Sequence, residues 1–193
     1  MTTRRRLETK VEIPTDKSAW HPAPLAGSLV LVSSRSSSGR THVSRKTWLT
    51  MVSSSPAMLA LSCRISHRTA INILETREFV INVPGEDLAA RAWAASDALS
   101  EDGASAGGWS MTDGVRVMVP RITECRAHLE CGLESSRRIT DEDIVFFGRI
   151  VSVSLDESLL KGAPEERYRA LRSLLYLEPD LFAVIDAARR IDL

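Results

Sequence analysis

Apolar and polar residues alternate in several short runs of the chain, which is the pattern of a strand that buries one face. The clearest run is AMLALSCRIS at 57–66, where Leu59, Leu61 and Cys63 share one face. Similar runs predict further strands at 27–34, 78–84, 115–120, 125–136 and 143–155. RRITDED, between the last two runs, predicts a hairpin connection.

Helical spacing occurs between these strands and again near the C-terminus. RTAINILETR at 68–77 places Ile71 and Leu74 on one face, and GEDLAARAWAAS at 85–96 is amphipathic. Residues 97–114 are small, polar and rich in glycine, which predicts a loop. EERYRALRSLLYL and DLFAVIDAARRI, which Pro179 separates, predict two C-terminal helices.

The order of these elements predicts a mainly β (α+β) fold. Short strands with helices inserted, and no repeated strand–helix–strand unit, favour an antiparallel barrel with peripheral helices over a parallel sheet. At 193 residues the chain has the size of one large domain. We predict an N-terminal arm at 1–21, a barrel domain at 22–160, and C-terminal helices at 161–193 that pack on the domain or on a dimer partner.

The charge balance limits the partners of the protein. Its 25 basic and 25 acidic residues cancel, so we expect no binding to nucleic acid or to a membrane surface. The arginines at 4–6 are not followed by an apolar segment, and no run is long enough to span a bilayer, which predicts a cytoplasmic protein. The odd cysteine set, Cys63, Cys125 and Cys131, predicts reduced, buried thiols.

The usual catalytic motifs are missing from the sequence. It contains no GxSxG, HExxH, CxxC or GxxxxGK[ST] motif, and its cysteines lack metal-ligand spacing, so we expect no metal site. His128 alternates with Ala127 and Leu129, which predicts that its side chain faces solvent or an interface.

A group of hydrogen-bond donors is the strongest chemical signal. Ser62, Arg64 and Ser66 share one face of the strand at 57–66, and SHRT then begins the next helix. Hydroxyls, an arginine fork and the free N–H groups of a helix N-terminus together suit a phosphate. The alternative is structural: Ser66 or Thr69 caps the helix, and Arg64 pairs with an acid.

The order of motifs from residue 22 to 155 resembles that of the flavin reductase-like, FMN-binding split β-barrel family. TWLT at 47–50 and SSSP at 53–56 are similar to its Ser-Trp-x-Thr and Ser-x-x-Pro-Pro segments. Arg68-Thr69 resembles its Arg-x-Thr helix start, and EFVIN at 78–82 resembles the strand that follows. AHLECGLE and VFFGRIVSV look like its later strands.

The resemblance implies an antiparallel split β-barrel that forms a homodimer, with one FMN per subunit at the interface. It implies hydride transfer from NADH or NADPH to FMN, a small-molecule flavin or other acceptor, and an oxygenase as a further partner. The implied cofactor-binding residues are His42, Thr47, Trp48, Leu49 and Thr50 near the isoalloxazine, and Ser62, Arg64, Ser66, Arg68 and Thr69 near the phosphate. No catalytic side chain is expected, because the cofactor carries the reaction and the protein orients it.

Two departures from the family pattern leave alternatives open. His42 stands where the family often has asparagine, and EDGASAGGWSMTDG replaces an Asp-Lys-Phe segment. The role of that lysine is unfilled or falls to Arg45, Lys46 or Arg91. One alternative is therefore an FMN-binding electron-transfer or sensor protein without reductase turnover. The other is a binding protein on the same barrel that has lost FMN.

Overall fold

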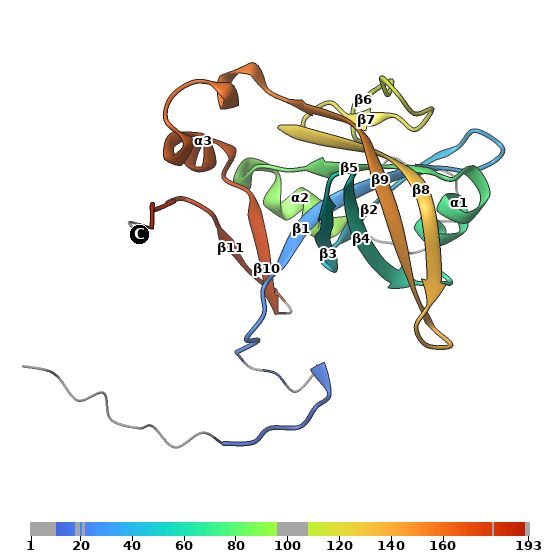
Figure 1. Cartoon of the computed structure of the whole chain (residues 1–193), viewed down its shortest axis with the longest axis horizontal. Coiled ribbons are helices and arrows are strands. Elements are labelled where there is room, and N and C mark those ends of the chain that lie inside the picture. The colour runs from blue at the N-terminus through green and yellow to red at the C-terminus, as the bar shows by residue number, and fades with distance from the viewer. Residues whose placement is uncertain (1–10, 18–19, 21, 96–107, 179, 192–193) are drawn as a thin grey trace, which may run out of the picture.

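The fold is built from strands that pair antiparallel throughout the described part of the chain (Figure 1). The structure is a computed structural model, and it describes residues 11–17, 20, 22–95, 108–178 and 180–191. The strands are β1 (Gly27–Arg35), β2 (Thr41–Lys46), β3 (Leu49–Ser54), β4 (Ala57–Arg64), β5 (Glu78–Val83), β6 (Met111–Thr112), β7 (Arg121–Ile122), β8 (Ala127–Arg138), β9 (Asp143–Leu155), β10 (Leu174–Glu178) and β11 (Leu181–Val184). The helices are α1 (Arg68–Thr76), α2 (Ala89–Ala94) and α3 (Pro164–Leu171), with short 3₁₀ turns η2 (Glu86–Leu88) and η3 (Glu157–Leu160).

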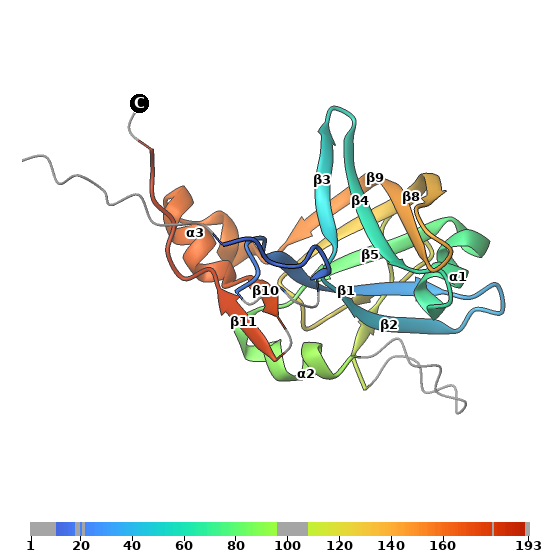
Figure 2. The same cartoon turned by 90° about the horizontal axis from the view of Figure 1, so that it is seen from below.

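One sheet carries most of the molecule, in the order β11-β10-β1-β5-β8-β9-β4-β3, and β2 pairs with the edge of β1 opposite β5. Figure 2 shows the β3–β4 hairpin projecting away from β1 and β2, with α3 and α1 at opposite ends of the molecule. This arrangement confirms the predicted antiparallel fold with peripheral helices.

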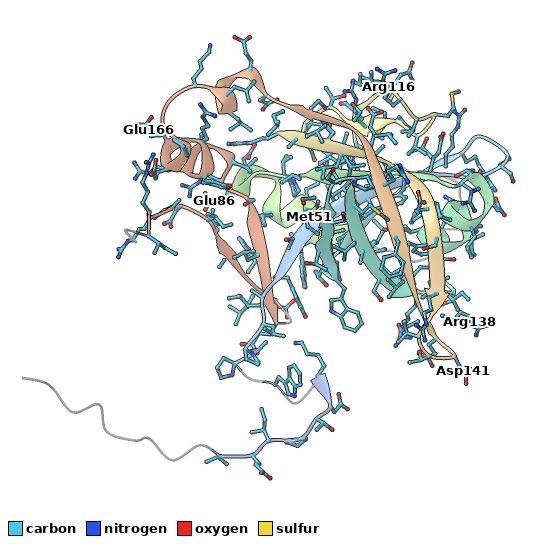
Figure 3. The ribbon with its side chains drawn as sticks, in the orientation of Figure 1. Met51, Glu86, Arg116, Arg138, Asp141 and Glu166 are labelled. Carbon is cyan, nitrogen blue, oxygen red and sulfur yellow. The ribbon has the colours of Figure 1, made fainter. Side chains whose placement is uncertain are left out.

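The longest hairpin, β8–β9, turns at the predicted RRITDED segment. At its tip Arg138 donates to the carbonyl oxygen of Asp141 at 2.9 Å (Figure 3). The pairing shifts register between Glu130 and Cys131, and again between Leu133 and Ser135. Such irregularities bend a strand and increase its twist, which lets the sheet curl around its core.

The main core lies inside the curled sheet. The predicted alternation in β4 is confirmed, because Leu59, Leu61 and Cys63 are all buried. They pack in one cluster with Phe79 of β5 and Phe146 of β9. All three cysteines of the chain are buried and free of disulfides, as predicted. No helix in the described ranges is long and apolar enough to cross a membrane.

The buried face of α1 differs from the prediction. Leu74 is 43% exposed and Ile71 only half-buried, whereas Ala70 and Ile73 belong to the main core. The physical reason is that two polar residues of the helix also turn inward. Asn72 donates to the hydroxyl of Ser34 on β1 at 3.0 Å, and Thr69 bonds a hydroxyl on β2. These hydrogen bonds rotate the helix away from the face that apolar spacing alone would bury.

The strand predicted at 115–120 is wrong, because this segment forms bends and pairs with no strand. Val117 and Val119 are buried against Val80, so its apolar residues serve a small separate cluster. The backbone N–H groups of residues 115–117 donate to the carboxylate of Glu130, which is 1% exposed. A buried side chain therefore provides the hydrogen bonds that a neighbouring strand would have given.

The helix predicted at 85–96 is shorter in the structure. The segment at 85–96 contains η2 and α2, which ends at Ala94. Most of the loop predicted at 97–114 lies outside the described residues. At its described end Trp109 is 6% exposed, and the guanidinium carbon of Arg91 lies 3.7 Å from the centroid of its ring. This tryptophan is therefore part of the packed structure.

The C-terminal segment holds one helix, so the prediction of a second is wrong. α3 ends at Leu171, and the residue that caps it, Arg172, has a left-handed φ of 46°. The chain then forms β10, which pairs with β1, and β11, which pairs with β10. Leu174, opposite Leu29, is 1% exposed. Pairing with an open strand edge outweighs the local helical pattern here. The domain boundary at 160–161 stays a prediction.

Candidate functional site

The chain bends sharply between β2 and β3, at Thr47 and Trp48. β2 pairs with β1, whereas β3 pairs with β4 at the far end of the sheet order. Gly27, at the start of β1, faces the carbonyl oxygen of Thr47 so closely that a Cβ atom would collide with it. Glycine at this position therefore lets the bend pack directly on β1.

A cavity of about 500 Å³ lies at this bend. Leu49 and Thr50 of β3 pair with Leu61 and Ala60 of β4, and the N–H of Ser62 donates to the carbonyl of Trp48 at 2.9 Å. Because β4 alternates, its apolar face enters the core and its other face turns to the cavity. The lining residues are Lys17, Trp20, Leu25, Ala26, Gly27, Thr47, Trp48, Leu49, Thr50, Ala60, Ser62, Val145 and Tyr176.

Thr47, Trp48, Leu49 and Thr50, which the resemblance places near the isoalloxazine, all line this cavity. Ser62, which it places near the phosphate, lines the same cavity. The indole of Trp48 is 54% exposed, so it forms a wall and is not part of the core. The described lining residues contain hydroxyl groups and aromatic rings but no histidine and no carboxylate. It is therefore suited to bind and orient a flat molecule, and it offers no acid–base pair for direct catalysis.

The predicted phosphate residues form a second group, beyond Ser62 along β4. Arg64 and Ser66 are exposed, and Arg64 lies 3.5 Å from Glu142 with both side chains largely in solvent. Arg68 is the first residue of α1, whose first turn has no acidic residue and whose N-cap, His67, makes no side-chain cap. The alternative pairing of Arg64 with an acid is thus present, but it leaves the guanidinium accessible.

Two predicted residues lie elsewhere. His42 is 8% exposed and Thr69 is fully buried, and neither lines the cavity. The hydroxyl of Thr69 is 2.7 Å from that of Ser44, which also accepts a hydrogen bond from the ammonium of Lys46 at 2.7 Å. His42, Ser44 and Lys46 alternate along β2 and so share one face. This face forms a buried polar layer against α1, with Lys46 only 5% exposed.

Sequence reasoning missed the other walls of the cavity. Tyr176 lies on β10, which was predicted as helix. Its ring stacks on Trp93 with centroids 5.9 Å apart, and the guanidinium carbon of Arg45 lies 4.2 Å from the centroid of Trp93. Lys17 and Trp20 belong to the N-terminal arm, whose proline-rich sequence shows no periodicity. The tryptophan, the one aromatic residue among residues 1–21, is the signal that the arm packs on another part of the protein.

A smaller cavity of about 270 Å³ adjoins the first, and Leu49 and Thr50 line both. Its lining is mostly aliphatic and comes from β1, β3, β5, β8 and the segment around β10. The two cavities together extend the site from the bend at Thr47 to core residues such as Leu59 and Leu174.

The remaining titratable groups do not form a second site in the described ranges. No three His, Cys, Asp or Glu side chains there are grouped as metal ligands. Burial raises the pKa of the Cys131 thiol to about 12, so it is not a nucleophile at neutral pH. His128 was predicted to face solvent or an interface. It does not simply face solvent, because it is half-buried and its ring bonds the carbonyl of Ile122 at 2.8 Å and the hydroxyl of Ser154 at 3.2 Å; the interface alternative stays a prediction. Burial lowers its pKa.

The family model of the flavin reductase like domain matches residues 23–180. The chain belongs to this family. The match spans the bend, β4 and the start of α1, so both groups of predicted site residues lie within the family domain.

Solved structures share the fold at low sequence identity. Flavoredoxin from Methanosarcina acetivorans is 19% identical with a TM-score of 0.81, over 96% of each chain. The 2-nitrobenzoate 2-nitroreductase NbaA of Pseudomonas fluorescens is 21% identical with a TM-score of 0.79, also over 96% of each chain. Nitrilotriacetate monooxygenase component B from Bacillus cereus is 16% identical with a TM-score of 0.78; the match covers 96% of this chain and 100% of the other.

Proposed function

We propose that this protein is an FMN-dependent oxidoreductase that accepts hydride from NADH or NADPH. The observation that carries the proposal is the cavity at the β2–β3 bend. It is lined by four of the five predicted ring-binding residues, Thr47, Trp48, Leu49 and Thr50. Ser62 of β4 also lines it, and Arg64 at the end of β4 and the start of α1 follow in sequence. Membership of the flavin reductase like family supports a flavin as the ligand.

The residues present fit FMN. A volume of about 500 Å³ lies in the range of ordinary cofactor pockets, and tryptophan and hydroxyl side chains suit a flat ring with polar edges. Ser62 and Arg64 lie on the same face of β4, about 6.6 Å apart at the usual rise of a strand. Arg64, Arg68 and the N–H groups of the first turn of α1 would hold the phosphate.

Bound FMN would supply the two-electron chemistry. The chain would contribute position: Trp48 limits how the ring lies, the hydroxyls of Thr47, Thr50 and Ser62 bond its polar edge, and Tyr176 closes the side toward β10. Such positioning can supply most of the acceleration of a hydride transfer.

An anaerobic titration of the FMN-loaded protein with NADH, and separately with NADPH, tests the reaction. Loss of the oxidised-flavin absorbance on the timescale of turnover is expected with at least one donor. A flavin that stays oxidised with both donors, but exchanges electrons with dithionite or a redox partner, would favour the alternative of an electron-transfer or sensor protein. This alternative is supported by the fold that the protein shares with a flavoredoxin. A protein that binds no FMN would support the second alternative.

The phosphate assignment has its own test, which separates FMN from riboflavin. Arg64→Ala is expected to weaken FMN binding about tenfold while leaving riboflavin binding unchanged, because only FMN carries the phosphate. Arg190→Ala, which removes an exposed arginine paired with Glu165 far along the chain, is the matched control. Equal losses for the two flavins, or no loss, would refute the assignment.

We further propose a homodimer. β4 pairs with β9 only as far as Arg149, and beyond it Val151, Val153 and Leu155 are 43–57% exposed. Met51 and Val52 on β3 are also exposed, at 55% and 48%. Exposed apolar groups of this kind mark interaction sites. Val153→Glu is expected to convert the dimer to a monomer in light scattering, whereas a wild-type monomer would refute the proposal.

The acceptor would be a small molecule, or a free flavin that a separate oxygenase consumes. The fold shared with a monooxygenase component supports the second case. We propose that the protein acts in the cytoplasm, where nicotinamide donors and reduced thiols coexist.

A further inference from the structure

The N-terminal arm contributes directly to the cavity, through Lys17, Trp20 and Leu25. The arm is held in a turn by its own contacts. The indole N–H of Trp20 donates to the carbonyl of Pro14 at 2.9 Å, and its backbone N–H donates to the carbonyl of Lys17 at 3.2 Å. The ammonium of Lys17 lies 5.7 Å from the centroid of the indole ring. Lys17 and Trp20 are therefore fixed relative to each other at the cavity wall.

The arm side of the cavity combines one positive charge with aromatic rings. Among the described residues of the lining, Lys17 is the one charged side chain, and none of them is an acid. Trp20, Trp48 and Tyr176 place aromatic rings around the same space. Flat rings bind aromatic ligands by stacking, and a single cation beside them favours a ligand that also carries a negative charge.

We infer that the arm forms a binding wall for planar aromatic anions, such as aromatic carboxylates, beside the flavin. This inference rests on the proposed function and names the class of small molecule that the site takes. Leu49 and Thr50 line both cavities, whereas Lys17 and Trp20 line only the larger one. The aromatic anion would therefore lie in the larger cavity, against the arm, and the smaller cavity adds space beyond Leu49 and Thr50. Trp20 provides stacking area, and Lys17 selects for charge.

The charge selection is moderate because Lys17 is only half-buried. Pairs that are partly exposed to water are screened, so the preference for an anion over a neutral ligand of the same shape is about fivefold. It decreases as the salt concentration rises.

The test compares 2-naphthoate with 2-naphthol, which has the same ring system and is neutral at neutral pH. Both are titrated by calorimetry into the FMN-loaded protein and into the FMN-free protein. The variants are Lys17→Gln, Trp20→Ala and, as a control, Lys161→Gln, which removes an exposed lysine paired with Glu157 in η3.

Wild type and the control are expected to bind naphthoate about fivefold more tightly than naphthol. Lys17→Gln should abolish the difference, and Trp20→Ala should weaken both ligands equally. Equal affinities in the wild type, or a preference that survives Lys17→Gln, would overturn the inference. A Lys17→Gln variant whose flavin midpoint potential changes while naphthoate binding does not would assign the charge to the flavin, and would also overturn it. Flavin loading is read separately by absorbance, so a failure of FMN to bind refutes the proposed function and not the arm wall.

Discussion

Replacing Glu130 with glutamine should be among the most destabilising single changes in the barrel. One carboxylate oxygen of Glu130 accepts the backbone N–H of Arg116 at 2.6 Å, and both oxygens lie within 3.0 Å of the N–H of Val115. The N–H of Val117 lies 3.3 Å away and the Nε of Arg121 3.9 Å. The side chain is 1% exposed, so water cannot replace a lost acceptor.

The magnitude follows from this geometry. Glutamine keeps one acceptor oxygen and places an amide N–H₂ against backbone N–H groups, which leaves donors facing donors. A hydrogen bond to a charged group contributes about 1.5–3 kcal/mol, and removing one partner of a buried ionic network costs about 3–5 kcal/mol. We expect Glu130→Gln to lower the free energy of unfolding by about 3–5 kcal/mol. That is a large part of the total stability of an ordinary domain.

Urea denaturation followed by tryptophan fluorescence measures this loss at a fixed protein concentration. Glu134→Gln is the matched control on the same strand, because its carboxylate lies 3.0 Å from Arg149 with both side chains about half exposed, at 48% and 45%. Solvent screens such a pair, so its midpoint should not change. If both variants shift the midpoint equally, the carboxylate of Glu130 does not organise the 115–120 segment.

Three other predictions follow from close packing and burial. Gly27→Ala should lower the free energy of unfolding by about 1–3 kcal/mol and weaken FMN binding, because the added Cβ would collide with Thr47. Gly132→Ala is the control: its Cβ would meet nothing within 4 Å, so this variant should melt at the same temperature as the wild type. Because burial lowers the pKa of His128, the unfolded chain binds more protons below the ordinary pKa of 6.5; stability should fall as pH drops below that value, and His128→Gln should flatten the fall in melts at several pH values. The thiol of Cys131 should react with iodoacetamide only after unfolding, as mass spectrometry of the native and denatured protein would show.

The elements with a strict two-residue period were predicted well from the sequence. β9 matches the run at 143–155 at both ends, and β4 buries the predicted face. The failures lie where bonds between distant segments decide the structure. Residues 115–120 have apolar residues at strand spacing, but the buried Glu130 takes their N–H groups. The C-terminal segment has helical spacing, but the open edge of β1 recruits it as β10.

The candidate site shows the same division. The resemblance named the segment from Thr47 to Thr50 and Ser62, and the pairing of β3 with β4 brings them together. Thr69 was expected near the phosphate or as a helix cap, from its position at a helix start, yet its hydroxyl bonds Ser44 in the interior. Lys17 and Tyr176 could not be predicted, since they reach the cavity from opposite ends of the chain. Only the folded sheet brings them together.

A crystal structure of the protein saturated with FMN tests the central claim most directly. We predict density for the isoalloxazine ring in the cavity at the β2–β3 bend, in contact with Trp48, Thr50 and Ser62, and density for the phosphate near Arg64 and the first turn of α1. Protein shown by absorbance to carry FMN, but with the ring bound elsewhere and this cavity filled by water, would contradict the account.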